Sequence, residues 1–259
     1  MTASDAEYRG LCAATWDLWR DDTASWSDRF FYLDVIREYG EPVLDLGCGT
    51  GRLLLDYLSL GIDVEGLDNA PEMLAVCREK AERAGFAPVL YRQELAGLAL
   101  PRRYRTILGP SSALQLVTAP GAAEVCVRRL FDHLEPGGAL VGSFSFEWQP
   151  GQPLETEWEL LFAKSRPEDG AMVRAWTREW REPQVRLWHT EQRFEVELDG
   201  EVVARELHRR SPEGRWYSQA EATELFAAAG FTDIEVYHEF THSPAMQDSR
   251  LFCVLGVRP

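Results

Sequence analysis

The sequence of 259 residues has no uninterrupted apolar run of the length that a membrane span requires. Its first residues, M-T-A-S-D, are polar and lack the apolar segment of a secretory signal peptide. It contains few cysteines and no C-x-x-C pair; the five are Cys12, Cys48, Cys77, Cys126 and Cys253. An odd number of widely scattered cysteines supports neither a zinc site nor a disulfide framework. We therefore expect no bound metal, no membrane association and a reducing, cytoplasmic location.

Basic residues are in the minority, because 27 Lys and Arg stand against 42 Asp and Glu and give a formal net charge of −15 at pH 7. Proteins that bind the phosphates of nucleic acids usually carry a basic excess, so this composition argues against a nucleic-acid partner. A local group of arginines at positions 102, 103 and 105 is explained by a solvated loop. The acidic balance favours a cationic or neutral ligand over an anionic one.

A glycine-rich turn between residues 43 and 52 is the most informative feature that is present. Residues 43–46 are a short apolar run, typical of a parallel strand that is buried on both faces. Glycines at positions 47, 49 and 51 allow a tight turn and leave room for a ligand against the main chain. The helix predicted at residues 50–60 then points its N-terminal amides toward that ligand.

A second strand, predicted at residues 63–67, brings Asp68 to the same edge of the sheet. A carboxylate at the carboxyl ends of parallel strands can accept both hydroxyls of a ribose, so this order predicts a nucleoside-binding crevice. A dinucleotide-binding turn would have a small residue where this chain has Arg52. Pyrophosphate binding, and with it a nicotinamide-dependent dehydrogenase, is therefore disfavoured.

The run D-L-G-C-G-T-G-R at 45–52, with G-L-D-N-A-P-E-M-L at 66–74, resembles the glycine motif and the acidic second motif of class I S-adenosylmethionine-dependent methyltransferases. The L-E-P-G-G turn at 134–138 and the terminal order of helix, A-G-F and two strands resemble the same family. The resemblance covers residues 38–146 and 216–259. It implies an α/β fold with a doubly wound, seven-stranded, mostly parallel sheet and S-adenosyl-L-methionine as the cofactor.

Two segments lie outside the resemblance. Residues 149–215 contain three alternating runs, at 171–181, 185–198 and 201–210, the last two joined by the hairpin signal Asp199-Gly200. They predict an antiparallel β insertion that serves as an acceptor cap or a dimer contact. Residues 1–37 are rich in aromatic side chains and are predicted as a helical lid, because relatives with this layout have N-terminal helices over the cofactor. The core is then 38–148 and 216–259, with a helix opened by the capping box Ser218 and Glu221.

The resemblance also implies where the cofactor binds. Asp45 is expected to reach the methionine amino group, Gly47, Cys48 and Gly49 to approach by their backbone, and Asp68 to hold the ribose. Further contacts are expected from Asn69, Met73, Gln93, Glu94, Leu95, Pro110, Ser111 and Gln115, and from the lid residues Tyr8, Trp16 and Tyr32. Gln93 or Glu94 would face the adenine amino group, where the family usually has aspartate, and Gln115 could instead cap a turn. Aromatic faces beside a sulfonium gain about 0.5–2 kcal/mol of cation–π attraction.

The activity implied is methyl transfer to a nitrogen or oxygen of a small molecule by in-line displacement. A neutral amine needs only its lone pair, whereas a hydroxyl also needs a base, for which His189, His208 and Glu147 are the candidates. The layout and the R-W-Y-S turn are loosely similar to sugar-amine and small-amine N-methyltransferases. An RNA or protein methyltransferase is an alternative against which the charge and the G-P-S-S segment at 109–112 argue; a non-catalytic cofactor-binding protein is another. A monomer and a homodimer are both open.

Overall fold

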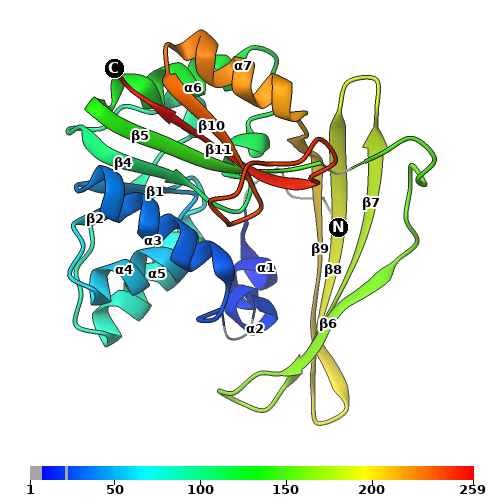
Figure 1. Ribbon diagram of the computed structural model, residues 1–259. Coiled ribbons are helices and arrows are strands. Elements are labelled where there is room, and N and C mark those ends of the chain that lie inside the picture. The colour runs from blue at the N-terminus through cyan, green and yellow to red at the C-terminus, as the bar shows by residue number, and fades with distance from the viewer. Residues whose placement is uncertain (1–7, 21–22, 147) are drawn as a thin grey trace.

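A seven-stranded sheet forms the core of the computed structural model, which describes residues 8–20, 23–146 and 148–259 (Figure 1). The strands lie in the order β10-β11-β5-β4-β1-β2-β3. Their bounds are β1 Val43–Leu46, β2 Val64–Asp68, β3 Leu90–Arg92, β4 Tyr104–Gly109, β5 Leu134–Ser145, β10 Thr232–His238 and β11 Leu251–Val257. Strands β1 to β5 pair in parallel, and β11 is antiparallel to both β5 and β10. The predicted doubly wound, mostly parallel sheet is confirmed.

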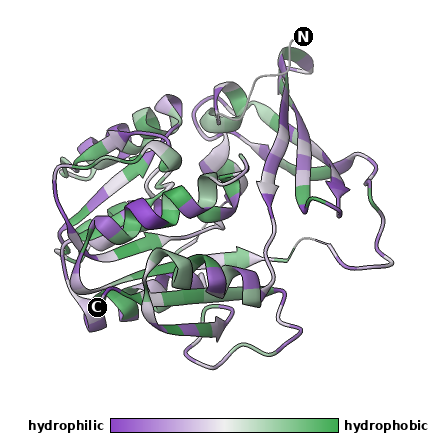
Figure 2. Cartoon of the chain, turned by 90° about the horizontal axis from the view of Figure 1, so that it is seen from above, coloured by the Kyte–Doolittle hydropathy of each residue, from purple (hydrophilic) through white to green (hydrophobic). Residues whose placement is uncertain are grey.

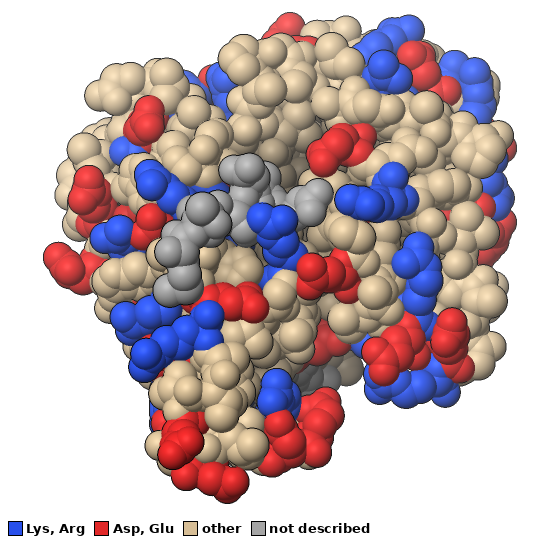
Figure 3. All heavy atoms as spheres, turned by 180° about the vertical axis from the view of Figure 1, so that it is seen from behind, with Lys and Arg blue, Asp and Glu red and all other residues tan. Residues whose placement is uncertain are grey.

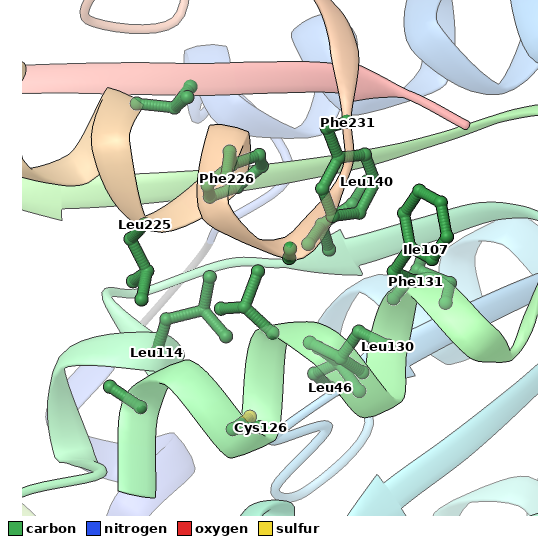
Figure 4. Packing of buried hydrophobic residues seen from close by; sticks show 14 of the residues in the cluster. Leu46, Ile107, Leu114, Cys126, Leu130, Phe131, Leu140, Leu225, Phe226 and Phe231 are labelled. Atoms are coloured by element: carbon green, nitrogen blue, oxygen red, sulfur yellow. The ribbon is translucent and has the colours of Figure 1, made fainter. Parts of the chain in front are cut away.

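Helices cover both faces of this sheet, and two hydrophobic clusters result (Figure 1). On one face lie α3 (Ser27–Tyr39), α4 (Arg52–Ser59) and α5 (Pro71–Arg83); on the other lie α6 (Ala122–Asp132) and α7 (Gln219–Ala229). Figure 4 shows α6 and α7 meeting over the sheet through Leu130, Phe131, Leu225 and Phe226. Strands β1 and β2 are buried along their whole length because helices cover both faces of the sheet.

A second sheet of four antiparallel strands stands beside the first. It consists of β6 (Glu159–Ser165), β7 (Met172–Glu182), β8 (Leu187–Leu198) and β9 (Glu201–Arg215). The predicted antiparallel insertion is therefore present, with one strand more than the three alternating runs indicate. Strand β6 escapes the pattern because a register shift interrupts its alternation and only Phe162 is buried in it. Figure 2 shows hydrophilic and hydrophobic residues mixed along these strands, as in a sheet with one solvated face.

Two short helices, α1 (Gly10–Ala14) and α2 (Trp16–Arg20), lie between the two sheets. Cys12 of α1 is buried in one cluster with Phe162, Val173 and Phe194 of the second sheet. Ala13 is buried in another cluster with Met73 of α5. The third N-terminal helix, α3, packs in the core instead. No helix among the described residues is long and apolar enough to cross a membrane.

Candidate cofactor-binding site

A cavity of about 340 Å³ lies at the carboxyl ends of β1, β2, β3 and β4, and it is bordered by Tyr8 and by Trp16 and Arg20 of α2. Its volume is in the range of small-molecule sites. Fourteen of the sixteen residues predicted from the sequence line it. They are Tyr8, Trp16, Asp45, Gly47, Cys48, Gly49, Asp68, Asn69, Met73, Gln93, Glu94, Leu95, Pro110 and Ser111. The residues that follow four different strands thus meet in one place.

The glycine turn forms the floor of the cavity. Gly47 and Gly49 have positive φ angles of 63° and 55°, which L side chains rarely adopt. Beneath them, a Cβ atom at Gly66 would meet Cys48 Sγ at 2.8 Å, so the thiol fills space that a larger residue at position 66 would need. Cys48 is buried, and a hydrogen bond with Cys77 together with burial raises the pKa of its thiol. Cys48 therefore packs under the turn as a thiol rather than acting as a thiolate nucleophile.

Asp45 supplies an unsatisfied carboxylate. It is 1% exposed, and its Oδ1 has no hydrogen-bond partner among the described residues. Burial raises the pKa of Asp45 to about 7, with Arg52 opposing the shift and Asp68 adding to it. A buried carboxylate oxygen without a partner is costly, so this position favours a ligand that carries a positive charge. The amino group of an amino acid is such a ligand.

Asp68 is fixed by the backbone around it. Its Oδ2 accepts a hydrogen bond from Gly49 N at 2.8 Å and its Oδ1 accepts one from Ala70 N at 2.8 Å. Burial raises the pKa of this carboxyl, while the amide hydrogen bonds oppose that shift. A carboxylate offers about four acceptor sites, so Asp68 keeps acceptor capacity for a ribose hydroxyl beside these amides.

Gln93 and Glu94 differ in how much hydrogen-bond acceptor capacity their side chains have left for a ligand. Gln93 Nε2 donates to Ala99 O at 3.0 Å, and Gln93 Oε1 accepts from Ala99 N at 2.9 Å, so this amide is engaged with the backbone. Glu94 accepts from Asn69 Nδ2 at 3.2 Å and keeps acceptor capacity. The geometry therefore favours Glu94 over Gln93 as the acceptor for an adenine amino group.

The N-terminal segment is attached to both sides of the cavity. Gly10 N donates to Glu72 Oε2 of α5 at 2.6 Å, and Leu11 N donates to Glu206 Oε2 of β9 at 2.7 Å. Tyr8 Oη donates to Glu213 Oε1 of β9 at 3.2 Å. The second sheet and α5 thus hold the segment that carries the lining residues Tyr8 and Trp16.

Two predicted residues lie outside the cavity lining. Tyr32 is fully buried on α3 in the core cluster, where it packs beside Phe31. Gln115 is also fully buried: its Nε2 donates to the carbonyls of Ser145 and Arg215, each at 3.0 Å, and its Oε1 accepts from Ser145 N at 2.6 Å. This geometry supports a structural role for Gln115, the alternative to cofactor binding that the sequence left open.

The two candidate histidines are engaged with other side chains. His189 stacks on Trp180 with ring centroids 4.8 Å apart, and burial lowers the pKa of its imidazole. His208 Nε2 lies 2.8 Å from Glu206 Oε2. Neither histidine lines the cavity. The third candidate, Glu147, lies outside the described residues.

The sequence reasoning missed several lining residues: Arg20, Thr50, Arg52, Leu53, Leu67, Ala96, Ala113, Leu116, Val117, Thr118, Ala119 and Ala122. Thr50 Oγ1 donates to Asp17 Oδ1 at 2.6 Å, and Arg52 pairs with Asp28. A signal existed for Arg20, because it stands four residues after Trp16 and so shares a helix face with it. The small and apolar residues at 116–122 carry no comparable chemical signal.

The comparisons with known proteins agree with this geometry. Residues 43–138 match the family model described as a methyltransferase domain. A protein of Geobacillus sp. (strain WCH70), named as an inferred methyltransferase, is 24% identical over 234 residues, which are 86% of this chain and 89% of that protein. Other curated relatives align mainly over the shared domain, and the chain spans only 31% to 59% of their length.

Solved structures share the fold along the whole chain. An S-adenosylmethionine-dependent methyltransferase from Clostridium acetobutylicum ATCC 824 superimposes with a TM-score of 0.75 at 20% identity, covering 96% of this chain and 97% of that one. A sugar N-methyltransferase from Streptoalloteichus sp. ATCC 53650 gives a TM-score of 0.73 at 20% identity, covering 100% and 96%. At such identities the likeness establishes the fold and leaves the acceptor undetermined.

Proposed function

We propose that this chain, whose residues 43–138 match a methyltransferase domain, is a class I S-adenosylmethionine-dependent methyltransferase that methylates a nitrogen atom of a small molecule. S-adenosylmethionine supplies a methyl group that its sulfonium already activates for displacement. The protein must then hold the cofactor, align the acceptor nitrogen with the methyl carbon and exclude water. Alignment of two reactants in this way is worth about 7–11 kcal/mol.

We assign the cofactor contacts to the three carboxylates that line the cavity. Asp45 holds the ammonium of the methionine end, Asp68 the ribose hydroxyls, and Glu94 the adenine amino group. The glycine turn admits the cofactor against bare backbone. Tyr8 and Trp16 cover it as part of a lid that comprises residues 8–20.

We propose a nitrogen acceptor because the described lining residues include no carboxylate or histidine beyond those assigned to the cofactor. Asp45, Asp68 and Glu94 are the carboxylates there, and each is assigned to the cofactor. An amine that arrives uncharged attacks through its lone pair, whereas a hydroxyl must lose its proton to a base. A nitrogen acceptor therefore fits this cavity better than an oxygen acceptor.

The surface supports a small acceptor over an RNA. On the face shown in Figure 3, Lys and Arg alternate with Asp and Glu and form no continuous basic area. The net charge of −15 opposes binding to a polyanion. Among structures of the same fold is the sugar N-methyltransferase, which makes amino sugars a natural first class of acceptors to test.

The test is a screen of the purified protein with S-adenosylmethionine and matched pairs of acceptors that differ only in an amine or a hydroxyl at one carbon. We expect S-adenosylhomocysteine to form, and the acceptor to gain one methyl group in its mass spectrum, with the amine members alone. The initial rate should rise with pH until the amine is fully deprotonated. The variants His189→Gln and His208→Gln should show the same pH dependence of the initial rate as the unaltered protein. Methylation of the hydroxyl members, or of RNA or protein but no small amine, would overturn the proposal.

A further inference from the structure

Two of the cysteines, Cys48 and Cys77, meet beneath the floor of the cofactor cavity. The Cys48 thiol donates a hydrogen bond to Cys77 Sγ, and this contact joins the glycine turn to α5. Cys77 is fully buried, whereas Cys48 lines the cavity and is 6% exposed. The two residues therefore form a dithiol that small solutes approach from the cavity.

Glycines at positions 51 and 66 leave the space that the two sulfur atoms occupy. A Cβ atom at Gly51 would lie 2.6 Å from Cys77 Sγ, and one at Gly66 would lie 2.8 Å from Cys48 Sγ. Gly51 N also donates to Cys48 O at 2.8 Å, so the turn itself packs onto both sulfur atoms. Because protein interiors are close-packed, a change in the distance between the two sulfur atoms displaces the turn.

The two thiols differ in acidity. The hydrogen bond from Cys48 lowers the pKa of Cys77. The positive charges of Lys80 and Arg78 act in the same direction, while burial and the charge of Asp45 act against it. The same hydrogen bond raises the pKa of Cys48. Cys77 is therefore the first of the two to become a thiolate, which is the form that peroxides oxidise.

We propose that hydrogen peroxide oxidises this pair to a disulfide between Cys48 and Cys77, and that the disulfide weakens cofactor binding until it is reduced. The Cys77 thiolate attacks one oxygen of the peroxide, the O–O bond breaks, and Cys77 becomes a sulfenic acid while the other oxygen leaves as water after taking up a proton. Cys48 Sγ then attacks the Cys77 sulfur. The S–S bond forms, the S–O bond breaks, and the departing hydroxide takes the Cys48 thiol proton, so two thiols are oxidised and one peroxide is reduced to two waters.

The disulfide acts on the cofactor site through the glycine turn. A disulfide holds its sulfur atoms about 2.05 Å apart, closer than a hydrogen bond between thiols does, so the turn shifts toward α5. Gly49, the residue after Cys48, donates to Asp68 Oδ2 at 2.8 Å and so holds the carboxylate proposed to bind the ribose. The shift weakens this contact. The proposal rests on the cofactor site and not on the proposed acceptor.

The test treats the reduced protein with hydrogen peroxide and then measures two quantities, the disulfide by mass spectrometry and the affinity for S-adenosylhomocysteine by calorimetry. Trypsin cleaves after Arg52, between the two cysteines, so the disulfide leaves peptides 38–52 and 53–78 linked at a mass two hydrogens below their sum. We expect the oxidised protein to bind S-adenosylhomocysteine at least about tenfold more weakly, and dithiothreitol to restore the affinity.

Cys77→Ser removes one sulfur atom at a position that does not line the cavity. The reduced variant should bind S-adenosylhomocysteine within about twofold of the unaltered protein and keep that affinity after peroxide treatment. If Cys77→Ser fails to fold, Cys77→Ala takes its place. Cys126→Ser, at a buried position on α6, is the matched control and should lose affinity on oxidation as the unaltered protein does.

Three outcomes would overturn the proposal: no linked peptides after oxidation, linked peptides with unchanged affinity, or an equal loss of affinity in oxidised Cys77→Ser. Because no acceptor is present in these measurements, a failure to methylate any amine leaves their outcome unaffected.

Discussion

Gly49 N donates a hydrogen bond to Oδ2 of Asp68 at 2.8 Å. This contact joins the glycine turn after β1 to the acidic end of β2, so the backbone that lines the cavity and the carboxylate proposed to bind the ribose are held together. Parallel pairing of β1 with β2 places the two segments at the same sheet edge. The contact explains why a turn and a carboxylate that are separate in sequence act together.

Loss of the Asp68 carboxylate is expected to remove most of the cofactor affinity. Asp68→Ala deletes two backbone hydrogen bonds and the proposed ribose contact, and hydrogen bonds to charged groups contribute about 1.5–3 kcal/mol each. We expect S-adenosylhomocysteine to bind at least about a hundredfold more weakly in calorimetry. Asp63→Asn, an exposed aspartate paired with Arg102, serves as the control and should bind normally.

Binding of S-adenosylhomocysteine is expected to strengthen as the pH rises through about 7, the pKa of buried Asp45. The proposed ammonium contact needs the ionised carboxylate, so affinity should be about tenfold weaker at pH 6 than at pH 8 and level off above that. The folded-state pKa is raised, so the protonated carboxyl favours the folded protein, and this group's contribution to the free energy of unfolding falls from about pH 4 to pH 7.

Asp45→Asn provides the control for this pH dependence. The variant should bind more weakly at pH 8 and show no change in affinity between pH 6 and pH 8. A dissociation constant of the unaltered protein that is flat over the same range would contradict the assignment of Asp45 to the ammonium.

Gln115 is expected to matter for stability and not for the cofactor. Gln115→Leu removes the side chain that bonds to the Ser145 amide and to the half-buried carbonyls of Ser145 and Arg215, at a cost of about 3 kcal/mol in the free energy of unfolding. Urea denaturation measures this loss, and the dissociation constant of S-adenosylhomocysteine should stay within about twofold, because Gln115 lines no part of the cavity. Gln247→Leu, at an exposed position, should change neither quantity.

Removal of Glu206 is expected to loosen the lid. Its carboxylate accepts the Leu11 amide at the start of α1, where a negative charge also favours the helix. In Glu206→Ala, hydrogen exchange of the α1 amides should rise by about tenfold, and S-adenosylhomocysteine should dissociate faster. Glu201→Ala, exposed on the same strand, is the matched control. Unchanged exchange in α1 would show that Glu72 at the Gly10 amide is enough to hold the helix.

The parts of the site that the sequence predicted are those set by local rules. Positive φ angles at Gly47 and Gly49 follow from glycine alone, and the Ser218–Glu221 capping box is confirmed because both partners lie within one helical turn. Asp68 follows a buried apolar strand, so its position at the sheet edge was predictable from strand order.

The parts that the sequence did not predict depend on contacts between distant segments. Gln115 bonds to Arg215, a hundred positions away, and nothing near Gln115 indicates that partner. Tyr32 is one of several aromatic residues near the N-terminus, and only the packing of α3 places it in the core instead of over the cavity.

The class of fold, the glycine turn and the methyl donor were predictable from short segments, because strand order and backbone dihedral preferences are encoded locally. The packing of the second sheet against α1, and the exclusion of His189 and His208 from the residues that line the cavity, became visible in the folded chain alone. The burial of a side chain and the pairing of its charge depend on contacts between segments that are distant in sequence. The local sequence pattern does not specify those contacts.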